Sequence, residues 1–199
     1  MTHAPNSPEP ANGNAPPTRL PRLTVRQGTA DTQNQWPRVY RRDETANGRL
    51  AIAVSDHACE LLADLADCLG SGFYLLYVHV VPRGTELPGR YQSPLLQRAE
   101  LRSVLAENTA LFEQDGRHNV WIGAADGSGF LVYDRHDLVY AYGPLPAFEQ
   151  VLLRRGFTSG TFSLDVIHSH HYHGAFDDAV RALLGRWDWH RTELRPQDE

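Results

Sequence analysis

Hydrophobic and polar positions first form a clear pattern at Leu50–Val54, where larger apolar side chains alternate with alanine. This period of two predicts a β-strand. The period then changes, because apolar residues recur three and four positions apart between Ala58 and Leu69, and Gly70 follows them. That spacing predicts an amphipathic helix with a glycine at its C-terminal end.

The next two patterned segments predict a central strand and a long helix. Residues Phe73–Val81 are apolar at consecutive positions, which is typical of a strand covered on both faces. Ser93 followed by Pro94 is a favourable helix start, and an apolar stripe continues from there to Asp115. We therefore expect a helix of about 20 residues over this segment.

Three short apolar segments then predict strands, at Val120–Ile122, Phe130–Tyr133 and Leu138–Tyr142. Their connections are short and rich in turn-forming residues, so we expect an antiparallel meander. A helix is predicted at Leu145–Leu152, a strand at Thr161–His168 from its alternation, and a last helix at Phe176–Trp187.

Together these patterns predict an α/β or α+β protein, with a mixed sheet of about six strands that includes the meander and is packed by about four helices. We assign residues 36–190 to a single globular domain. Residues 1–35 are rich in proline and asparagine and have few apolar side chains, which predicts a disordered N-terminal arm. Residues 191–199 are predicted to be a polar C-terminal tail.

Composition narrows the classes of partner. The chain of 199 residues has a formal net charge of −5, and all 19 of its basic residues are arginine. Because there is no dense basic run, neither nucleic acid nor an anionic membrane surface is an expected partner. No apolar run is long enough to suggest a signal peptide or a membrane span, so we expect a cytoplasmic protein.

The two cysteines do not suggest a disulfide. Cys59 and Cys68 lie nine residues apart in one predicted helix and project in different directions. Cys59 falls in the first helical turn, where the helix dipole lowers the pKa of a thiol. A nucleophilic role is conceivable, but a packed thiol is the main expectation, since no oxyanion motif surrounds it.

The segment from Asp165 to Gly174 contains four of the ten histidines and is the densest candidate for chemistry. In an extended chain His168 and His170 share a face, so both imidazoles can reach one divalent metal ion such as zinc. We expect His173 to be the third ligand, with Asp165 or His171 in a supporting role. The opposing interpretation is that these histidines are solvated or structural, and the sequence alone favours it.

Over six residues this string resembles the His-x-His-x-Asp-His signature of metallo-β-lactamase-like hydrolases, with His168, His170 and His173 at the matching positions. The resemblance implies a hydrolytic metal centre. The chain departs from the pattern because Tyr172 replaces the aspartate and only a short segment, ending at Glu199, follows. We therefore do not assign the chain to that family.

Three further features are weighed in the same way. The turn Asp134–Asp137 contains two carboxylates, a guanidinium and an imidazole that could form part of a site, although charged turns are usually solvated. His79 lies on an apolar strand face, so we expect a hydrogen-bonded core residue. Trp121, Tyr133 and Tyr140 could form an aromatic platform for a ligand or partner, or could serve core packing.

These observations leave three functions open. We favour a non-catalytic protein-binding or regulatory module without a cofactor, because no complete catalytic motif is visible. The alternative is a metal-dependent, zinc-type hydrolase that uses the histidines at positions 168–173. A further alternative is an immunity-type protein that neutralises a toxin, since a compact acidic protein can cover a basic active site.

Overall fold

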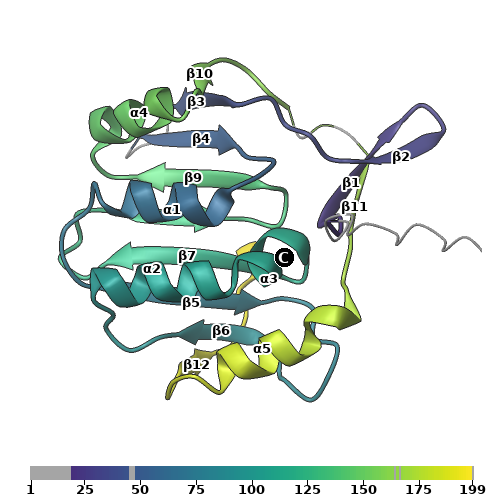
Figure 1. Ribbon diagram of the computed structural model, residues 1–199, viewed down its shortest axis with the longest axis vertical. Helices are drawn as coiled ribbons and strands as arrows, with labels where there is room; N and C mark the ends of the chain where they lie inside the picture. Colours follow the sequence, from purple (N-terminus) through teal and green to yellow (C-terminus); the bar gives the residue numbers. More distant parts are fainter. Residues whose placement is uncertain (1–18, 45–47, 164, 166, 199) are drawn as a thin grey trace, which may run out of the picture.

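The computed structural model describes residues 19–44, 48–163, 165 and 167–198, and it combines a large sheet with helices on one face (Figure 1). The sheet has nine strands in the order β10-β3-β4-β9-β8-β7-β5-β6-β12. Neighbouring strands are antiparallel except for the pair β10 and β3. The strands are β3 (Val39–Asp43), β4 (Arg49–Ala53), β5 (Phe73–His79), β6 (Gly89–Gln92), β7 (His118–Ala124), β8 (Phe130–Tyr133), β9 (Leu138–Tyr142), β10 (Thr158–Ser159) and β12 (His190–Thr192). The prediction of a mixed α/β architecture is therefore confirmed, but the expected sheet of about six strands was too small.

The helices cover one face of this sheet (Figure 1). They are α1 (Ala58–Ala66), α2 (Arg98–Glu107), α3 (Thr109–Gln114), α4 (Leu145–Arg154) and α5 (Asp177–Leu184). Alternation along the strands sends every second side chain toward them. Leu50, Leu75, Val120 and Leu131 are fully buried in this way, and together with the apolar stripe of α1 they form the core. None of the helices in the described part of the chain combines the length and apolar character that a membrane crossing requires.

A second, three-stranded sheet lies beside the large one (Figure 1). Its order is β11-β1-β2, formed by β1 (Leu23–Gln27), β2 (Ala30–Gln33) and β11 (His168–His170). Two of these strands fall within the segment that was predicted to be a disordered arm. Leu23 is 1% exposed, so a single well-packed residue helps to fix β1 against the domain. The remainder of the predicted arm, residues 1–18, lies outside the described residues.

Several predicted elements have different bounds in the structure. The single long helix is divided into α2 and α3 at Asn108, and it begins at Arg98 rather than at Pro94. Ser93 does not cap it, because its backbone N–H and its hydroxyl both hydrogen bond to the backbone of Leu75 and so extend the sheet. In the described part of 161–168, only His168 lies in a strand.

The C-terminal segment also differs from the predicted polar tail. It forms β12 and then a 3-10 helix, Pro196–Asp198, that ends on the open face of the sheet. Asp198 is 2% exposed and forms a buried ion pair with Arg90. Its backbone carbonyl accepts a hydrogen bond from the Asn119 side chain. This segment therefore packs against the domain through buried polar contacts.

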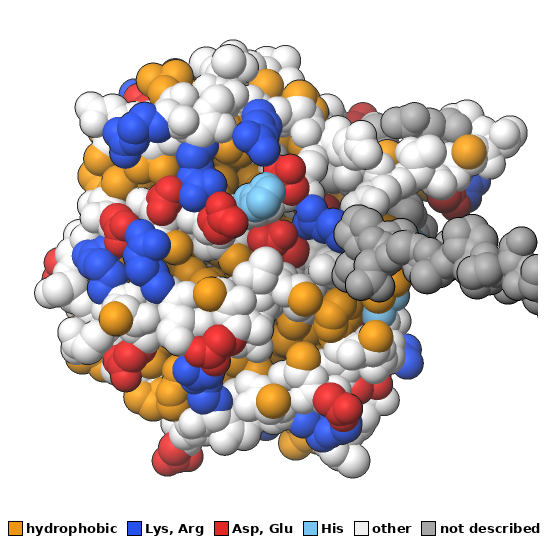
Figure 2. All heavy atoms as spheres, in the orientation of Figure 1, with side chains coloured by type: hydrophobic (Ala, Val, Ile, Leu, Met, Phe, Trp, Pro, Cys, Tyr) orange, Lys and Arg blue, Asp and Glu red, His pale blue; other side chains and the backbone are white. Residues whose placement is uncertain are grey.

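The helix-bearing face carries small groups of Arg and acidic side chains with apolar atoms between them (Figure 2). Ion pairs link many of these groups; Arg155 with Asp64 and Arg98 with Asp67 are examples. Among the side chains coloured in Figure 2, positive and negative charges alternate rather than separate into two fields. Exposed pairs of this kind contribute little stability individually.

Candidate metal centre

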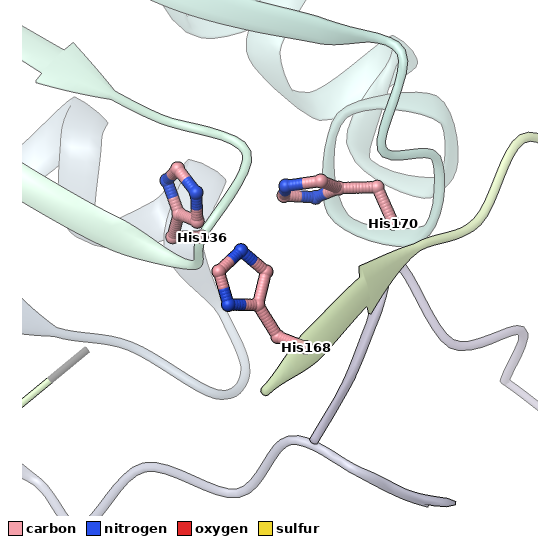
Figure 3. A group of neighbouring side chains, drawn as sticks. All are labelled: His136, His168 and His170. Carbon is pink, nitrogen blue, oxygen red and sulfur yellow. The ribbon is translucent and has the colours of Figure 1, made fainter. Parts of the chain in front are cut away.

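Three imidazoles converge where β11 passes the turn between β8 and β9 (Figure 3). They belong to His136, His168 and His170, and one ring nitrogen from each lies within 4.8 Å of the other two. The ring centroids are 4.9 to 5.3 Å apart. Nitrogens that share a tetrahedral zinc ion would be about 3.3 Å apart, given zinc–nitrogen distances of about 2.0–2.1 Å. The ring nitrogens would therefore have to approach one another by up to about 1.5 Å to share one ion.

Two of the ligand candidates come from β11 because of strand geometry. His168 and His170 are two residues apart, so both side chains project from the same face of the strand. The sequence predicted this pair and its shared face. His168 is exposed and His170 is half-buried, so the centre is accessible from solvent on the His168 side.

The third candidate, His136, was not predicted as a ligand. It lies in the β8–β9 turn, where Asp134 accepts hydrogen bonds from the backbone N–H groups of His136 and Leu138. Asp137 in the same turn adopts a left-handed φ of 59°. The other carboxylate oxygen of Asp134 is 3.1 Å from Nδ1 of His136. A carboxylate in this position accepts the Nδ1 proton and leaves the Nε2 lone pair for a metal ion.

His170 is held in the neutral form that binds metals. Burial lowers its pKa to about 3, and the nearby charge of Arg135 acts in the same direction. Its Nδ1 is buried and has no hydrogen-bond partner among the described residues. An imidazole must be deprotonated to coordinate a metal ion, so this environment favours ligation.

The N-terminal segment joins the two parts of the centre. Arg22 is 2% exposed, and its guanidinium lies 3.5 Å from the carboxylate of Asp137 in the turn that carries His136. The next residues form β1, in which Leu23 pairs with His170 and Val25 pairs with His168. One short stretch of chain therefore holds the turn and β11 next to each other.

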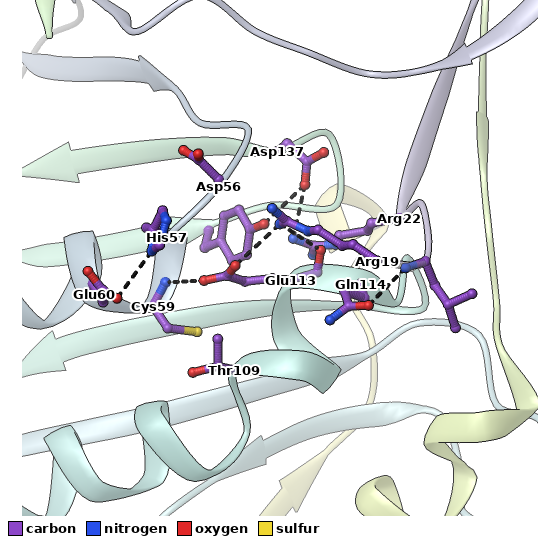
Figure 4. A network of polar contacts seen from close by, with 12 residues as sticks. Arg19, Arg22, Asp56, His57, Cys59, Glu60, Thr109, Glu113, Gln114 and Asp137 are labelled. Atoms are coloured by element: carbon purple, nitrogen blue, oxygen red, sulfur yellow. Dashed lines mark hydrogen bonds and ion pairs between the residues drawn. The ribbon is translucent and has the colours of Figure 1, made fainter. Parts of the chain in front are cut away.

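The same segment is anchored to the helix layer by partly buried polar contacts (Figure 4). Arg19 forms an ion pair with Glu113 at 3.2 Å. Glu113 in turn accepts a hydrogen bond from the backbone N–H of Cys59 at 2.9 Å. The backbone N–H of Leu20 donates to the side chain of Gln114. Helices α1 and α3 thus position the N-terminal segment, which positions the histidines.

The other predicted site residues have different partners. Nε2 of His173 lies 2.8 Å from the backbone carbonyl of Pro21, to which it donates a hydrogen bond. Nε2 of His171 lies 2.8 Å from the hydroxyl of Thr24. Asp165 is exposed, and its backbone N–H donates to Ser163. These three residues are not part of the converging group; His171 and His173 instead attach β1 and the residues just before it to the segment that follows β11.

Two expectations about single titratable residues need correction. Cys59 is buried, and burial together with Glu113 raises the pKa of its thiol, whereas the sequence suggested a lowered pKa. Both cysteines are free, as expected. His79 is a core residue, but neither of its ring nitrogens has a hydrogen-bond partner among the described residues. Its ring stacks on the ring of Tyr77 instead.

Comparison with protein-family models, with curated proteins and with solved structures finds no match to this chain. The fold and the histidine geometry are therefore the observations from which its function must be argued. Because His136 is 32 residues before His168 in the sequence, spacing alone gave no reason to combine the two. The concentration of Asp134, Arg135, His136 and Asp137 in one turn was the available signal.

Proposed function

We propose that this protein binds a divalent metal ion of the zinc type through His136, His168 and His170, and that it is a metal-dependent hydrolase. The observation that carries the proposal is the approach of three ring nitrogens to within 4.8 Å of one another from two separate parts of the chain. The carboxylate that orients His136 is a second supporting feature.

The donor set favours a catalytic centre over a structural one. Structural zinc sites are usually closed by four protein ligands, whereas catalytic sites use three and leave one position for water or substrate. A bound zinc ion supplies an activated water molecule and polarises a carbonyl or phosphoryl oxygen. The chain's own contribution is to hold three imidazoles together beside a solvent-accessible opening, with the positive charge of Arg135 near His170.

Metal analysis of the purified protein tests the proposal. We expect about one equivalent of zinc after incubation and dialysis, and loss of that equivalent in the variants His136→Ala, His168→Ala and His170→Ala. His190→Ala removes an exposed histidine of β12 and is the matched control. Thermal melting of each variant shows whether it is folded. Zinc that remains at wild-type stoichiometry in the folded His168→Ala variant would contradict the proposal.

His173→Ala separates this centre from the ligand set expected from the sequence. Because Nε2 of His173 already donates to the Pro21 carbonyl, we expect this variant to keep its metal and to lose some thermal stability. If His173→Ala loses metal while His136→Ala keeps it, the ligands are His168, His170 and His173, and the arrangement of His136, His168 and His170 is not the binding geometry.

A non-catalytic protein-binding module is the second candidate, and one observation favours it. Strand β2 forms an edge of the small sheet, and all four of its residues are exposed. An exposed edge offers unpaired backbone groups to a strand of a partner. Gln33→Pro would remove one such N–H group, so a partner that copurifies with the wild type and not with this variant would support the module. The toxin-neutralising alternative rests only on the net charge of −5.

A further inference from the structure

The face of the large sheet opposite the helices contains a cleft of about 410 Å³. Side chains that alternate with the core residues of β7, β8 and β9 line it. Val132 is the floor, because it is directly paired with Trp121 on one side and with Tyr140 on the other. His136 and Arg135 lie at one end, so the cleft adjoins the histidine centre.

The two aromatic walls are spaced to hold a flat ring. Trp121 and Tyr140 are separated by the strand that carries Val132, which places their backbones roughly 9.5 Å apart. A ring in van der Waals contact with both would need about 7–8 Å between the walls. The Val132 side chain is too short to fill that space, and the residue is 9% exposed. The backbone spacing therefore leaves room for one aromatic ring between the two side chains.

A stack of rings closes the other end of the cleft. The rings of Phe130 and Tyr142 are 4.2 Å apart with an interplanar angle of 15°. Phe130 and Trp121 are nearly parallel as well, with an angle of 10° and centroids 6.3 Å apart. The guanidinium of Arg49 lies 4.4 Å from the centre of the Tyr140 ring. Such surfaces bind aromatic ligands by stacking, largely without regard to the exact ring.

The polar lining of the cleft leaves room for an anion beside Arg135. Its two carboxylates are already engaged, because Asp198 pairs with Arg90 and Asp134 accepts backbone hydrogen bonds within the β8–β9 turn. Arg135 lines the cleft and has no carboxylate partner among the ion pairs of the described residues, whereas Arg49 is neutralised by Asp43. The indole N–H of Trp121 is buried and has no acceptor among the described residues. Both groups are donors, and an unpaired guanidinium binds carboxylate or phosphate strongly.

We propose that this cleft binds a small ligand with a flat aromatic ring and an anionic group. The ring stacks between Trp121 and Tyr140 above Val132, and the anionic group pairs with Arg135. Binding of this ligand requires no metal. The same placement puts the anionic end beside His136, so the ligand class is also the substrate class if the proposed metal centre exists, and that last step rests on the proposed function.

Calorimetric titration of the full chain in the presence of a chelator tests the proposal with four probes. Adenosine monophosphate and indole-3-carboxylate carry both features and represent a phosphate and a carboxylate source. Adenosine has the ring without the charge, and inorganic phosphate has the charge without the ring. We expect at least one of the first two to bind at least about tenfold more tightly than either of the last two.

Variants then locate the site. Arg135→Gln should weaken binding of the anionic probe by at least about tenfold and leave the affinity for adenosine unchanged. Arg154→Gln makes the same charge change at an exposed position of α4 and should weaken binding of neither probe. Val132→Phe fills the floor and should abolish binding, and Trp121→Ala should weaken every ring-containing probe. Tyr74→Ala removes an exposed ring of the same face outside the cleft and is the aromatic control.

The outcomes separate the sources and the two proposals. Binding of adenosine monophosphate alone identifies a nucleotide-like ligand, and binding of indole-3-carboxylate alone identifies an aryl carboxylate. The inference is overturned if neither probe binds, or if Arg135→Gln and a folded Val132→Phe both bind as the wild type does. The His168→Ala variant should retain the ligand, so loss of the metal centre and loss of this cleft are distinguishable.

Discussion

Replacing Arg22 by methionine perturbs the contact that joins the N-terminal segment to the turn carrying His136. The guanidinium lies 3.5 Å from the Asp137 carboxylate, donates to the backbone carbonyl of His118 at 2.8 Å and packs 4.2 Å from the centre of the Tyr133 ring. Methionine retains most of the apolar volume and removes the charge. Asp137, which is 8% exposed, is then left without its cation.

The magnitude follows from the burial of this pair. Burial raises the pKa of Asp137 to about 6 even with Arg22 in place, so this carboxylate depends on its partner to stay ionised at neutral pH. Removing one member of a buried ion pair costs about 3–5 kcal/mol in the free energy of unfolding. Since single domains are typically stable by about 5–15 kcal/mol, the variant should be markedly destabilised but measurable.

Urea unfolding at pH 7 measures the loss, and a double-mutant cycle assigns it. Asp137→Asn removes the second charge, so the double variant Arg22→Met/Asp137→Asn should be more stable than the sum of the single losses predicts, by at least about 1 kcal/mol. Zinc affinity should fall in Arg22→Met as well, although no ligand is changed. A loss below about 1 kcal/mol for Arg22→Met, or strict additivity, would refute this account of the N-terminal segment.

Three further predictions concern other parts of the molecule. Asp134→Asn should weaken zinc binding by about 10–100-fold, because it weakens the acceptor that orients His136. Asp126 accepts a backbone hydrogen bond in the β7–β8 turn, and Asp126→Asn should leave zinc binding unchanged. Equal effects of the two variants in a zinc titration would count against the orienting role of Asp134. A thiol reagent should label half-buried Cys68 in the native protein and Cys59 only after unfolding, because Cys59 is 2% exposed. Mass spectrometry measures the labelling, and rapid modification of both cysteines in the native protein would show that the N-terminus of α1 opens. Burial lowers the pKa of His79 to about 4, so the unfolded state binds the proton more readily than the folded state. The contribution of neutral His79 to the free energy of unfolding should be fully present above about pH 6.5 and should fall by up to about 3 kcal/mol as the pH decreases to about 4. The variant His79→Leu should lose that part of the dependence in urea unfolding, and an unchanged pH profile would exclude His79 as its source.

Sequence patterns identified the parts of the fold whose stability is local. The period of α1, the apolar run of β5 and the meander β7–β8–β9 could all be read directly, because each buries a regular face of its own. Strands β1, β2, β6 and β12 were missed. Each is short. Strands β1 and β12 pair with the distant strands β11 and β6, and β2 is the polar outer strand of a hairpin with β1, so local periodicity does not record them.

The candidate site was predicted in part for the same reason. His168 and His170 share a face through the two-residue period of a strand, and this is a local property. His136 joins them only because β1 pairs with β11 and Arg22 holds the β8–β9 turn. His173 was chosen by proximity in the sequence, but its side chain is directed to the Pro21 carbonyl. Similarly, Tyr133 was expected in an aromatic platform, yet it is buried in the core while Trp121 and Tyr140 face the cleft.

The most direct test of the central claim is a crystal structure of the protein grown with zinc, with the metal located by its anomalous scattering. The account predicts one ion bound by ring nitrogens of His136, His168 and His170 at about 2.0–2.1 Å, with a further position open to solvent. An ion bound elsewhere, or histidine rings that remain apart in the presence of zinc, would contradict it.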